Sequence, residues 1–246
     1  MKTPPRLEPL AWDTEFFGVK IGRVAAPETL DPLSLAAILE RAREQGMACL
    51  YFEASFDNPD LVRFCAKRGF YLVDIKSRLE KKPLAEVGPE QDPGLTFSRE
   101  ERYYPDLEAI SDALSLKSRF RYDPRFGESG ARRLYREWLR RSFREDFCSD
   151  FLSAVIDGRA AGFLTLRGKD HTSYIDLLAV ADWAQGRGLG GRLLKAAEGR
   201  IKAAGRNRFL VVTQGHNIGA VRFYQNNGFR TIGENPFYHI WLEDLD

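Results

Sequence analysis

The chain reads Gln-Gly-Arg-Gly-Leu-Gly at residues 185–190, and apolar residues at helical spacing follow from Leu189 onward. Three glycines in six residues let the backbone approach a ligand closely, because no Cβ stands in the way. The amides of such a turn and the amino end of the following helix together form a site suited to anions, above all phosphates. The stretch therefore predicts a phosphate-binding loop at the start of a helix.

This loop lies between a predicted strand and a predicted helix. Residues 174–181 (Tyr-Ile-Asp-Leu-Leu-Ala-Val-Ala) are typical of a strand, and the leucines and alanines after the loop recur at helical spacing to about Gly205. A P-loop would need Lys-Ser or Lys-Thr after its last glycine, and a dinucleotide-binding turn would need G-x-G-x-x-G spacing. The loop matches neither pattern, so a different phosphate-bearing ligand is expected.

The rest of the second half alternates strands with helices. Asp157-Gly158 separates two apolar runs and predicts a two-residue hairpin turn. Asn217 is suited to cap a helix, and Gly228 is suited to the position just after its last turn. Strands are predicted over 151–156, 160–166, 174–181, 208–213, 229–232 and 237–242, and helices over about 189–205 and 217–227.

Two motifs carry a resemblance to a known family. Gln185, Gly188 and Gly190 match the spacing [Q/R]-x-x-G-x-[G/A], and residues 220–229 match A-x-x-[F/L]-Y-x-x-x-G-F. In both motifs the chain resembles the GCN5-related N-acetyltransferases (GNAT), in which the first motif is the coenzyme A pyrophosphate loop. The resemblance implies an α/β (α+β) fold, the GNAT fold. Its mixed central sheet would splay at the coenzyme A site, between the strands at 174–181 and 208–213.

The resemblance also implies roles for individual residues. Tyr224 would be the general acid that protonates the departing sulfur, since a phenol with a pKa of about 10 stays protonated at neutral pH. The alternative is a core tyrosine, because Ile218, Val221 and Tyr224 share one helix face. Asp176 is one candidate for the base if its side chain faces the cleft, but a structural or capping role is more common for such a residue. A water or a backbone carbonyl fits the role of base equally well. The pantetheine arm would pair with the open strand edge. Acetyl-CoA, with no metal, would be held by Leu178, Ala179, Val180, Gln185, Gly186, Arg187, Gly188, Leu189, Gly190, Asn217 and Phe223.

The first half of the chain repeats the second. Residues 61–70 (Leu-Val-Arg-Phe-Cys-Ala-Lys-Arg-Gly-Phe) and 220–229 (Ala-Val-Arg-Phe-Tyr-Gln-Asn-Asn-Gly-Phe) agree at five positions, and the same offset aligns 46–52 with 205–211. A helix over 33–45 would match the helix after the glycine loop. The repeat indicates a shortened acetyltransferase-like unit ahead of the main one.

The functional residues do not repeat. Cys65 stands where Tyr224 stands, and a lone cysteine on an apolar helix face is usually inert packing, a nucleophile being the rival interpretation. Residues 28–34 replace the glycine loop with a proline and two acids, so this unit is expected to bind no coenzyme A. Residues 81–94 are rich in Pro, Gly and charge and predict a linker. The linker divides the chain into a truncated, degenerate GNAT-like domain (1–90) and a catalytic GNAT domain (91–246).

Two further segments narrow the resemblance. Residues 10–18 (Leu-Ala-Trp-Asp-Thr-Glu-Phe-Phe-Gly) resemble the opening W-D-[ST]-x-F-F-G of the TDP-fucosamine (dTDP-4-amino-4,6-dideoxygalactose) N-acetyltransferases, and residues 118–124 resemble their S-R-F-x-x-D-P segment. The resemblance implies acetyl transfer from acetyl-CoA to the amine of a nucleotide-linked amino sugar in bacterial polysaccharide biosynthesis. A peptide or other small amine is the first alternative acceptor, and non-catalytic acyl-CoA binding is the second alternative.

Positive charge is concentrated in one segment. Residues 117–144 carry ten Lys and Arg residues and three acidic ones, a net charge of +7, whereas the whole chain has +2. Arg132, Arg136 and Arg140 share one face of a predicted helix, which indicates a solvated face. The loop at 118–126 interleaves arginines with aromatic residues, a combination that suits a diphosphate with a stacked base or sugar. Substrate contacts are therefore predicted for Arg119, Arg121, Tyr122 and Phe17.

Composition excludes several classes of protein. No apolar run approaches 18 residues, so no membrane span is predicted, and no apolar stretch follows residues 1–5 as a secretory signal would require. Three cysteines, an odd number, favour a reducing compartment, and the three histidines show no ligand spacing for a metal. A cytoplasmic enzyme with a small-molecule substrate and no nucleic-acid partner is expected, and the formation of a homodimer is left open.

Overall fold

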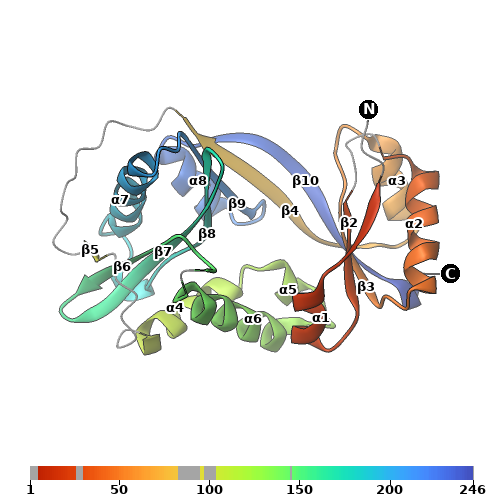
Figure 1. Cartoon of the computed structure of the whole chain (residues 1–246), viewed down its shortest axis with the longest axis horizontal. Coiled ribbons are helices and arrows are strands. Elements are labelled where there is room, and N and C mark those ends of the chain that lie inside the picture. The colour runs from red at the N-terminus through yellow and green to blue at the C-terminus, as the bar shows by residue number, and fades with distance from the viewer. Residues whose placement is uncertain (1–4, 26–29, 83–94, 97–103, 145, 246) are drawn as a thin grey trace.

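The computed structural model of the chain describes residues 5–25, 30–82, 95–96, 104–144 and 146–245. Their strands form one sheet in the order β1-β2-β3-β10-β4-β9-β8-β7-β6-β5, against which the helices pack (Figure 1). The pairs β2–β3 and β8–β9 are parallel, and every other described pair is antiparallel. The expectation of a mixed α/β fold is confirmed.

The described elements have the following bounds. The strands are β1 (Arg6–Pro9), β2 (Ile21–Ala25), β3 (Cys49–Glu53), β4 (Tyr71–Lys81), β5 (Leu95–Thr96), β6 (Asp150–Ile156), β7 (Arg159–Lys169), β8 (Thr172–Val180), β9 (Arg208–Gln214) and β10 (Arg230–Trp241). The helices are α1 (Ala11–Phe17), α2 (Pro32–Glu44), α3 (Pro59–Lys67), α4 (Tyr104–Ser115), α5 (Arg119–Tyr122), α6 (Gly127–Ser142), α7 (Leu189–Ala203) and α8 (Ile218–Asn226).

Local sequence signals account for most of these boundaries. Asp157 and Gly158 both take positive φ, 50° and 76°, as the predicted two-residue turn between β6 and β7 requires. α7 buries the leucines and alanines that recur at helical spacing, Leu193 and Ala197 among them. Asn217 caps α8, and Gly228 takes a φ of 85° just after it. The predicted hairpin and the two predicted helices are therefore confirmed.

The internal repeat is present in the structure as well. α3 and α8 each begin after an asparagine whose side chain accepts a hydrogen bond from the backbone N–H three residues on, at 3.2 Å for Asn58 and 3.3 Å for Asn217. A left-handed glycine follows each helix, Gly69 with φ 67° and Gly228 with φ 85°. In each copy a parallel strand pair precedes the helix, β2–β3 in the first and β8–β9 in the second. The N-terminal region is therefore an additional copy of the same unit.

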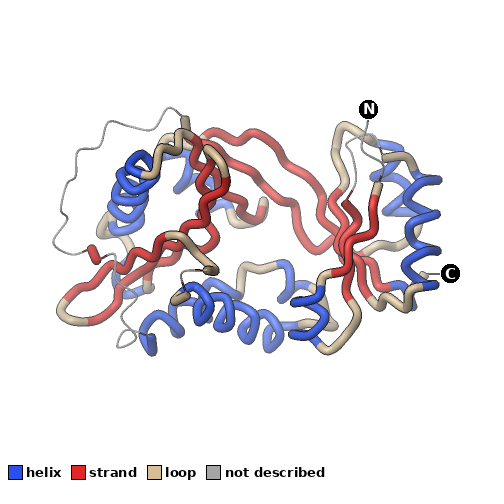
Figure 2. The backbone as a smooth tube through the Cα atoms, in the orientation of Figure 1, coloured by secondary structure: helices blue, strands red, loops and turns tan. Residues whose placement is uncertain are grey.

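Each copy gives its last strand to the other copy. β4 follows α3, yet it pairs with β9 over 76–81, and β10 follows α8, yet it pairs with β3 over 237–241. β4 and β10 also pair with each other and form the long ribbon that joins the two ends of the molecule (Figures 1 and 2). The predicted linker lies mostly at 83–94, outside the described residues. A boundary near residue 90 stays a prediction.

One sequence prediction at the carboxyl end was wrong. Residues 229–232 and 237–242 were expected to form two strands, but one continuous strand, β10, runs through both and includes Pro236. The Pro236 carbonyl accepts a hydrogen bond from Ala54 N at 3.1 Å, so its nitrogen faces the β3 side, where β3 has already ended. Proline is tolerated there because no ladder needs its missing N–H.

The buried residues separate into clusters that match the two copies and their junction. One packs α7 and α8 against β6 to β9, a second packs α2 and α3 against β3, and a third joins α1, α5 and α6 to β3 and β10. Cys65 is fully buried in the second cluster, and burial raises the pKa of its thiol to about 12, which suits packing. Among the described helices, none is both long and apolar enough to cross a membrane.

Candidate active site

β8 and β9 begin as a parallel pair and then part. The pairing runs from Thr172↔Arg208 to Ile175↔Val211 and ends there, although β8 continues to Val180. β9 continues to Gln214 as the pairing partner of β4. On the described residues, no strand covers the β9 side of β8 beyond Ile175, so the splay expected from the sequence is present.

The open edge of β8 presents backbone groups that point away from β7. Ala181 N donates to Ala161 O at 2.8 Å, so the backbone groups of Ala181 face β7. Alternation along a strand directs those of Leu178 and Val180 to the open side. All three residues from Leu178 to Val180 are partly exposed. This edge can accept one more extended chain.

A β-bulge lies at the point where the two strands part. Thr165 pairs with Leu177 and Leu166 with Ile175, so Asp176 is the extra residue of β8. Its carboxylate accepts a hydrogen bond from Arg167 Nη2 at 2.8 Å, and burial raises its pKa although Arg167 opposes the shift. The bulge thus turns an acidic side chain out at the mouth of the splay.

The glycine loop takes the conformation that its sequence predicts. Gly186 and Gly188 have φ of 75° and 72°, in the left-handed region that favours glycine, and Gly188 caps α7 without a side-chain hydrogen bond. The Gln185 amide donates to Val180 O at 3.3 Å and to Asp182 Oδ1 at 2.9 Å, which ties the loop to the end of β8. Residues 185–188 are exposed. The free amides of the first turn of α7 therefore face solvent beside the open strand edge.

The sequence predicted that Gly190 contacts coenzyme A, but in the structure its lack of a side chain serves the packing of two helices. A Cβ at Gly190 would lie 2.9 Å from two carbons of the Phe223 ring, so the glycine allows α7 to approach α8 closely. Phe223, predicted to contact the cofactor, thus fills the space that the glycine leaves. The structure assigns both residues a packing role, and their predicted contacts with coenzyme A stay predictions.

We expect Gly190→Ala to destabilise the fold by about 1–3 kcal/mol, because the new methyl group overpacks against the ring. Combining it with Phe223→Leu should recover most of the loss. Gly199→Ala in the same helix, where nothing lies within 4 Å, is the matched control and should be neutral or stabilising. Urea unfolding measures all three, and equal stability of Gly190→Ala and the wild type would contradict the assignment.

α8 brings Asn217 and Tyr224 to the same region. Tyr224 is 6% exposed and lies in the core cluster, with its ring centroid 5.2 Å from that of Phe223 and 5.4 Å from that of Phe229. Burial raises the pKa of its phenol, so the hydroxyl stays protonated. The side chain is therefore a core residue whose hydroxyl is protonated at neutral pH, and its catalytic role stays a prediction.

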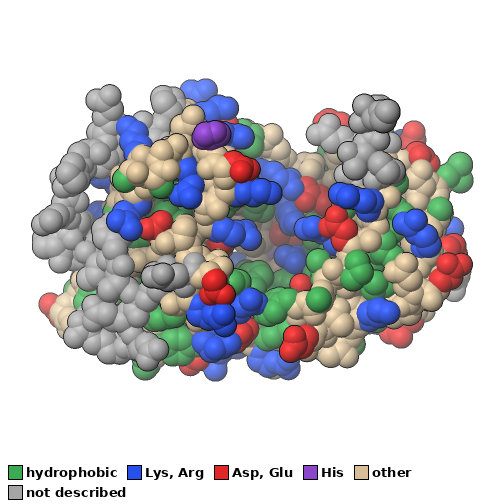
Figure 3. Space-filling model, viewed as in Figure 1, with side chains coloured by type: hydrophobic (Ala, Val, Ile, Leu, Met, Phe, Trp, Pro, Cys, Tyr) green, Lys and Arg blue, Asp and Glu red, His purple; other side chains and the backbone are tan. Residues whose placement is uncertain are grey.

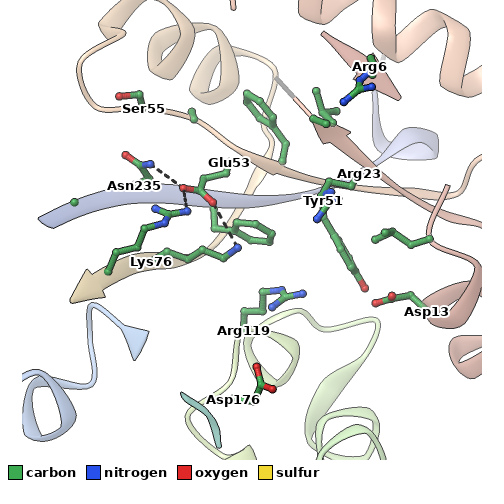
Figure 4. A pocket seen from close by; sticks show the side chains of 18 of the residues that line it. Arg6, Asp13, Arg23, Tyr51, Glu53, Ser55, Lys76, Arg119, Asp176 and Asn235 are labelled. Carbon is green, nitrogen blue, oxygen red and sulfur yellow. Dashed lines mark hydrogen bonds and ion pairs between the residues drawn. The ribbon is translucent and has the colours of Figure 1, made fainter. Parts of the chain in front are cut away.

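A cleft of about 1540 Å³ opens beside the splay. Its walls come from both copies, with β3, β4 and β10 on one side and α1, α5, α6 and β8 on the other. Figure 3 shows Lys and Arg side chains gathered around the hollow. Asp176 and Leu177 belong to the lining, so the cleft meets β8 where the strands part. Figure 4 shows the side chains that face it, among them Asp13, Tyr51, Glu53, Lys76, Arg119 and Asp176.

The structure separates the four residues predicted to contact substrate. Arg119 lines the cleft. Arg121 donates to Leu116 O at 3.1 Å, and Tyr122, which is 45% exposed, packs edge-on against His216. The Phe17 ring packs in the third cluster, with its centroid 4.3 Å from that of Phe126. Arg121, Tyr122 and Phe17 are not part of the cleft lining. Their contacts with substrate therefore stay predictions.

The sequence did not point to the cleft residues of the first copy. Lys76 and Arg78 alternate along β4, and Glu53 ends β3; in a sequence, such charges indicate a solvated strand face. In the structure these side chains are partly buried and face the cleft instead. These side chains lie opposite β8 only because β4 and β10 are exchanged between the two copies.

The comparison with protein families decides the class of this chain. The family "Acetyltransferase (GNAT) family" matches residues 112–229, which contain the glycine loop, the splayed strands and α8. The chain contains a GNAT acetyltransferase domain. This family uses acetyl-CoA as its acetyl donor. The membership of the GNAT family that the two motifs predicted is therefore confirmed for this domain.

Two curated relatives resemble this chain over much of its length. It is 28% identical over 224 residues to the "dTDP-fucosamine acetyltransferase" of Escherichia coli, covering 90% of this chain and 92% of that protein. It is 27% identical over 162 residues to the "Spore coat polysaccharide biosynthesis protein SpsD" of Bacillus subtilis, covering 65% of this chain. That match spans about half of the Bacillus protein, 52% of its length.

Solved structures share the fold of the whole chain. A protein of unknown function from Staphylococcus epidermidis superposes with a TM-score of 0.70 at 17% identity, covering 98% of this chain and 92% of that one. A GCN5-related N-acetyltransferase from Sphaerobacter thermophilus gives 0.64 at 15% identity, covering 97% and 77%. These likenesses show that the fold of the whole chain, including its N-terminal copy, occurs in other proteins.

Metal ligands are not gathered in the described part of the GNAT protein. No group of three or more His, Cys, Asp or Glu side chains is placed to hold an ion among those residues. His216 lies near the start of α8 with Nδ1 3.7 Å from Asp74 Oδ1, and burial raises the pKa of Asp74 to about 7. Neither residue is part of the cleft lining.

Proposed function

We propose that this chain transfers the acetyl group of acetyl-CoA to the primary amine of a nucleotide-linked amino sugar, of the dTDP-4-amino-4,6-dideoxyhexose type, in bacterial polysaccharide biosynthesis. The name of the Escherichia coli relative supports this acceptor class, and the name of the Bacillus subtilis relative supports polysaccharide biosynthesis. The GNAT domain supports the acetyl donor. The observation that carries the proposal is the cleft, because it joins the splayed strand edge to a wall of Lys and Arg side chains.

The residues around the splay fit acetyl-CoA. The left-handed turn at 186–188 and the first amides of α7 suit its diphosphate. The open backbone of 178–180 suits the pantetheine arm, which would add to β8 as an extended chain. Acetyl-CoA supplies an activated acetyl thioester when it is bound. Leu178, Ala179 and Val180, together with the loop, are therefore proposed to hold it.

The proposal needs one group to accept a proton from the amine and one to donate a proton to the sulfur. The acceptor amine attacks only when neutral, and Asp176 lies on the cleft with a pKa that burial raises, so its carboxylate can take the proton of the amine. Tyr224 keeps its proton because its phenol is buried, so it can donate to the departing sulfur. We propose that Asp176 acts as the base and Tyr224 as the acid.

The other acceptor classes fit the cleft less well. A polyamine carries several positive charges, and the cleft places Lys76, Arg78 and Arg119 where it would bind. A peptide amine stays a second candidate, since the cleft is wide enough for an extended chain. Non-catalytic acyl-CoA binding does not explain why an acidic residue and a cationic wall share the cleft with the splay.

Turnover tests the proposal directly. Release of the coenzyme A thiol is measured with acetyl-CoA and a panel of dTDP- and UDP-linked amino sugars, a peptide amine and a polyamine. We expect at least one nucleotide-linked amino sugar to be acetylated with a kcat/KM more than about tenfold above that of the same free sugar, because the nucleotide contributes binding energy in the transition state. The matching nucleotide sugar with a hydroxyl in place of the amine is the control. Turnover of none of the nucleotide-linked amines would refute the acceptor class.

A further inference from the structure

Two cations converge on one aromatic ring in the cleft. The Lys76 Nζ lies 3.8 Å from the centroid of the Phe237 ring, and the Arg119 guanidinium carbon lies 4.9 Å from it. Both side chains line the cleft, and Figure 4 shows them facing each other across it. Burial, aided by the charge of Arg119, lowers the pKa of Lys76 to about 8. The two like charges are therefore held together at an energetic cost.

The carboxylates around this pair do not balance it. Glu53 lies 3.5 Å from Lys76 Nζ, but it also accepts hydrogen bonds from Arg78 and from Asn235 Nδ2, the latter at 2.7 Å. Arg119 makes no ion pair with any carboxylate of the described residues. Lys76 and Arg78 thus share Glu53, whereas Arg119 acts on Asp13 and Asp74 only through its charge, which lowers their pKa while burial raises it. An anion placed between Lys76 and Arg119 would relieve their repulsion.

The Arg119 guanidinium is fixed from behind by a buried chain of hydrogen bonds. Its Nε donates to His239 Nε2 at 3.2 Å, and His239 Nδ1 lies 2.7 Å from Asp123 Oδ2. Burial lowers the pKa of His239 to about 4, so the ring is neutral at pH 7 and donates its Nδ1–H to Asp123. Trp241 Nε1 donates to the same carboxylate oxygen at 2.9 Å. This chain occupies the Nε of Arg119 and leaves its two terminal nitrogens for a ligand.

We infer that Lys76 and Arg119 form the binding site for the diphosphate of the substrate, and that His239 and Asp123 are positioning residues that hold Arg119 in place. Planar guanidinium groups bind phosphate oxygens in pairs, and an ammonium adds a second point of charge. The identity of the anion as a substrate diphosphate rests on the proposed function. The amine would then lie toward β8, where Asp176 faces the cleft.

Calorimetric titration of the full chain with dTDP, in the presence of saturating coenzyme A, tests this site. Lys76→Met and Arg119→Met should each weaken dTDP binding by about tenfold or more, since each removes a charged hydrogen-bond donor. Arg132→Met removes an equal charge from α6, where Arg132 pairs with Glu128, and should leave dTDP binding unchanged. Unchanged affinity in both cleft variants, or loss of dTDP binding once coenzyme A is present, would overturn the site.

The positioning role has its own readout. His239→Phe keeps a ring but removes the acceptor for Arg119, so the KM for the acceptor should rise at least fivefold while kcat and the KM for acetyl-CoA stay the same. His239→Gln offers an amide oxygen in its place and should bind dTDP more tightly than His239→Phe. If His239→Phe does not fold, Arg119→Lys tests the same contact. It keeps the positive charge but lacks the Nε that donates to His239. Wild-type dTDP affinity in Arg119→Lys would overturn the role of the chain of hydrogen bonds.

The outcomes separate this inference from the proposed function. Loss of dTDP binding in the two cleft variants, without acetylation of any nucleotide-linked amine by the wild type, supports the anion site and rejects the proposed acceptor class. Acetylation of such an amine, with wild-type KM in Lys76→Met and Arg119→Met, supports the function and rejects the site. A wild-type chain that binds no dTDP also rejects the site.

Discussion

Replacing Tyr224 with Phe should lower kcat by roughly 10²–10⁴-fold while leaving coenzyme A affinity nearly unchanged. The hydroxyl is the only group removed, and the ring keeps its contacts with Phe223 and Phe229. Loss of a proton donor to the departing sulfur slows the chemical step and not the binding of the donor. Steady-state kinetics with acetyl-CoA and a responsive acceptor measures kcat, and calorimetry measures the affinity for coenzyme A.

The pH profile sharpens this prediction. Burial raises the pKa of the Tyr224 phenol above its ordinary value of about 10, so activity should not fall through loss of this proton up to pH 9. Tyr238→Phe is the matched control, because Tyr238 is equally buried (5% exposed against 6%) but lies in the cluster around α2 and α3. A kcat equal in Tyr224→Phe and the wild type would leave Tyr224 as a core residue alone.

The second large effect is expected from Asp176→Asn, which should lower kcat/KM for the acceptor by roughly 10²–10⁴-fold. The amide has the same shape but cannot take a proton from the amine. In the wild type, activity should rise with pH as Asp176 loses its proton, at a pH above the ordinary pKa of an aspartate because burial raises it. In Asp176→Asn this rise of activity with pH, the acid limb of the profile, should be absent. A pH–rate profile of the wild type and the variant measures both the loss of rate and the loss of the acid limb.

Arg167→Met provides the control for the assignment of that limb. Arg167 lowers the pKa of Asp176 through its ion pair at 2.8 Å, so its removal should shift the acid limb to higher pH. Arg167 is 62% exposed, and breaking an exposed pair changes stability by no more than about 1 kcal/mol, so unfolding does not explain a loss of rate. An acid limb that stays in place in Arg167→Met would point to another group, such as Asp74.

Much of the local structure could be predicted from the sequence. The left-handed turn at Gly186 and Gly188, the hairpin at Asp157-Gly158 and the cap at Asn217 depend on residues close to one another in the chain. The predicted break within β10 failed for the opposite reason. Pro236 does not end β10 because its nitrogen faces the side on which β3 has already ended, and β3 lies far away in the sequence.

The candidate site was only partly visible in the sequence. Its second-copy residues stand in motifs of fixed spacing, so the glycine loop, the open edge of β8 and Tyr224 could be located. Its first-copy residues, Lys76 among them, stand in no motif and look like an ordinary strand surface. Of the four residues predicted to contact substrate, only Arg119 reaches the cleft, because the short helix α5 points successive side chains in different directions.

The sequence by itself determined the class of unit, its repetition and the copy that keeps the glycine loop, because these depend on backbone conformation and spacing within short segments. Only the tertiary structure decided that the two copies exchange their last strands. That exchange carries Lys76 on β4 and Phe237 on β10 to the wall opposite Asp176. The physical reason is that strand order follows from pairing between distant segments, which no local pattern encodes.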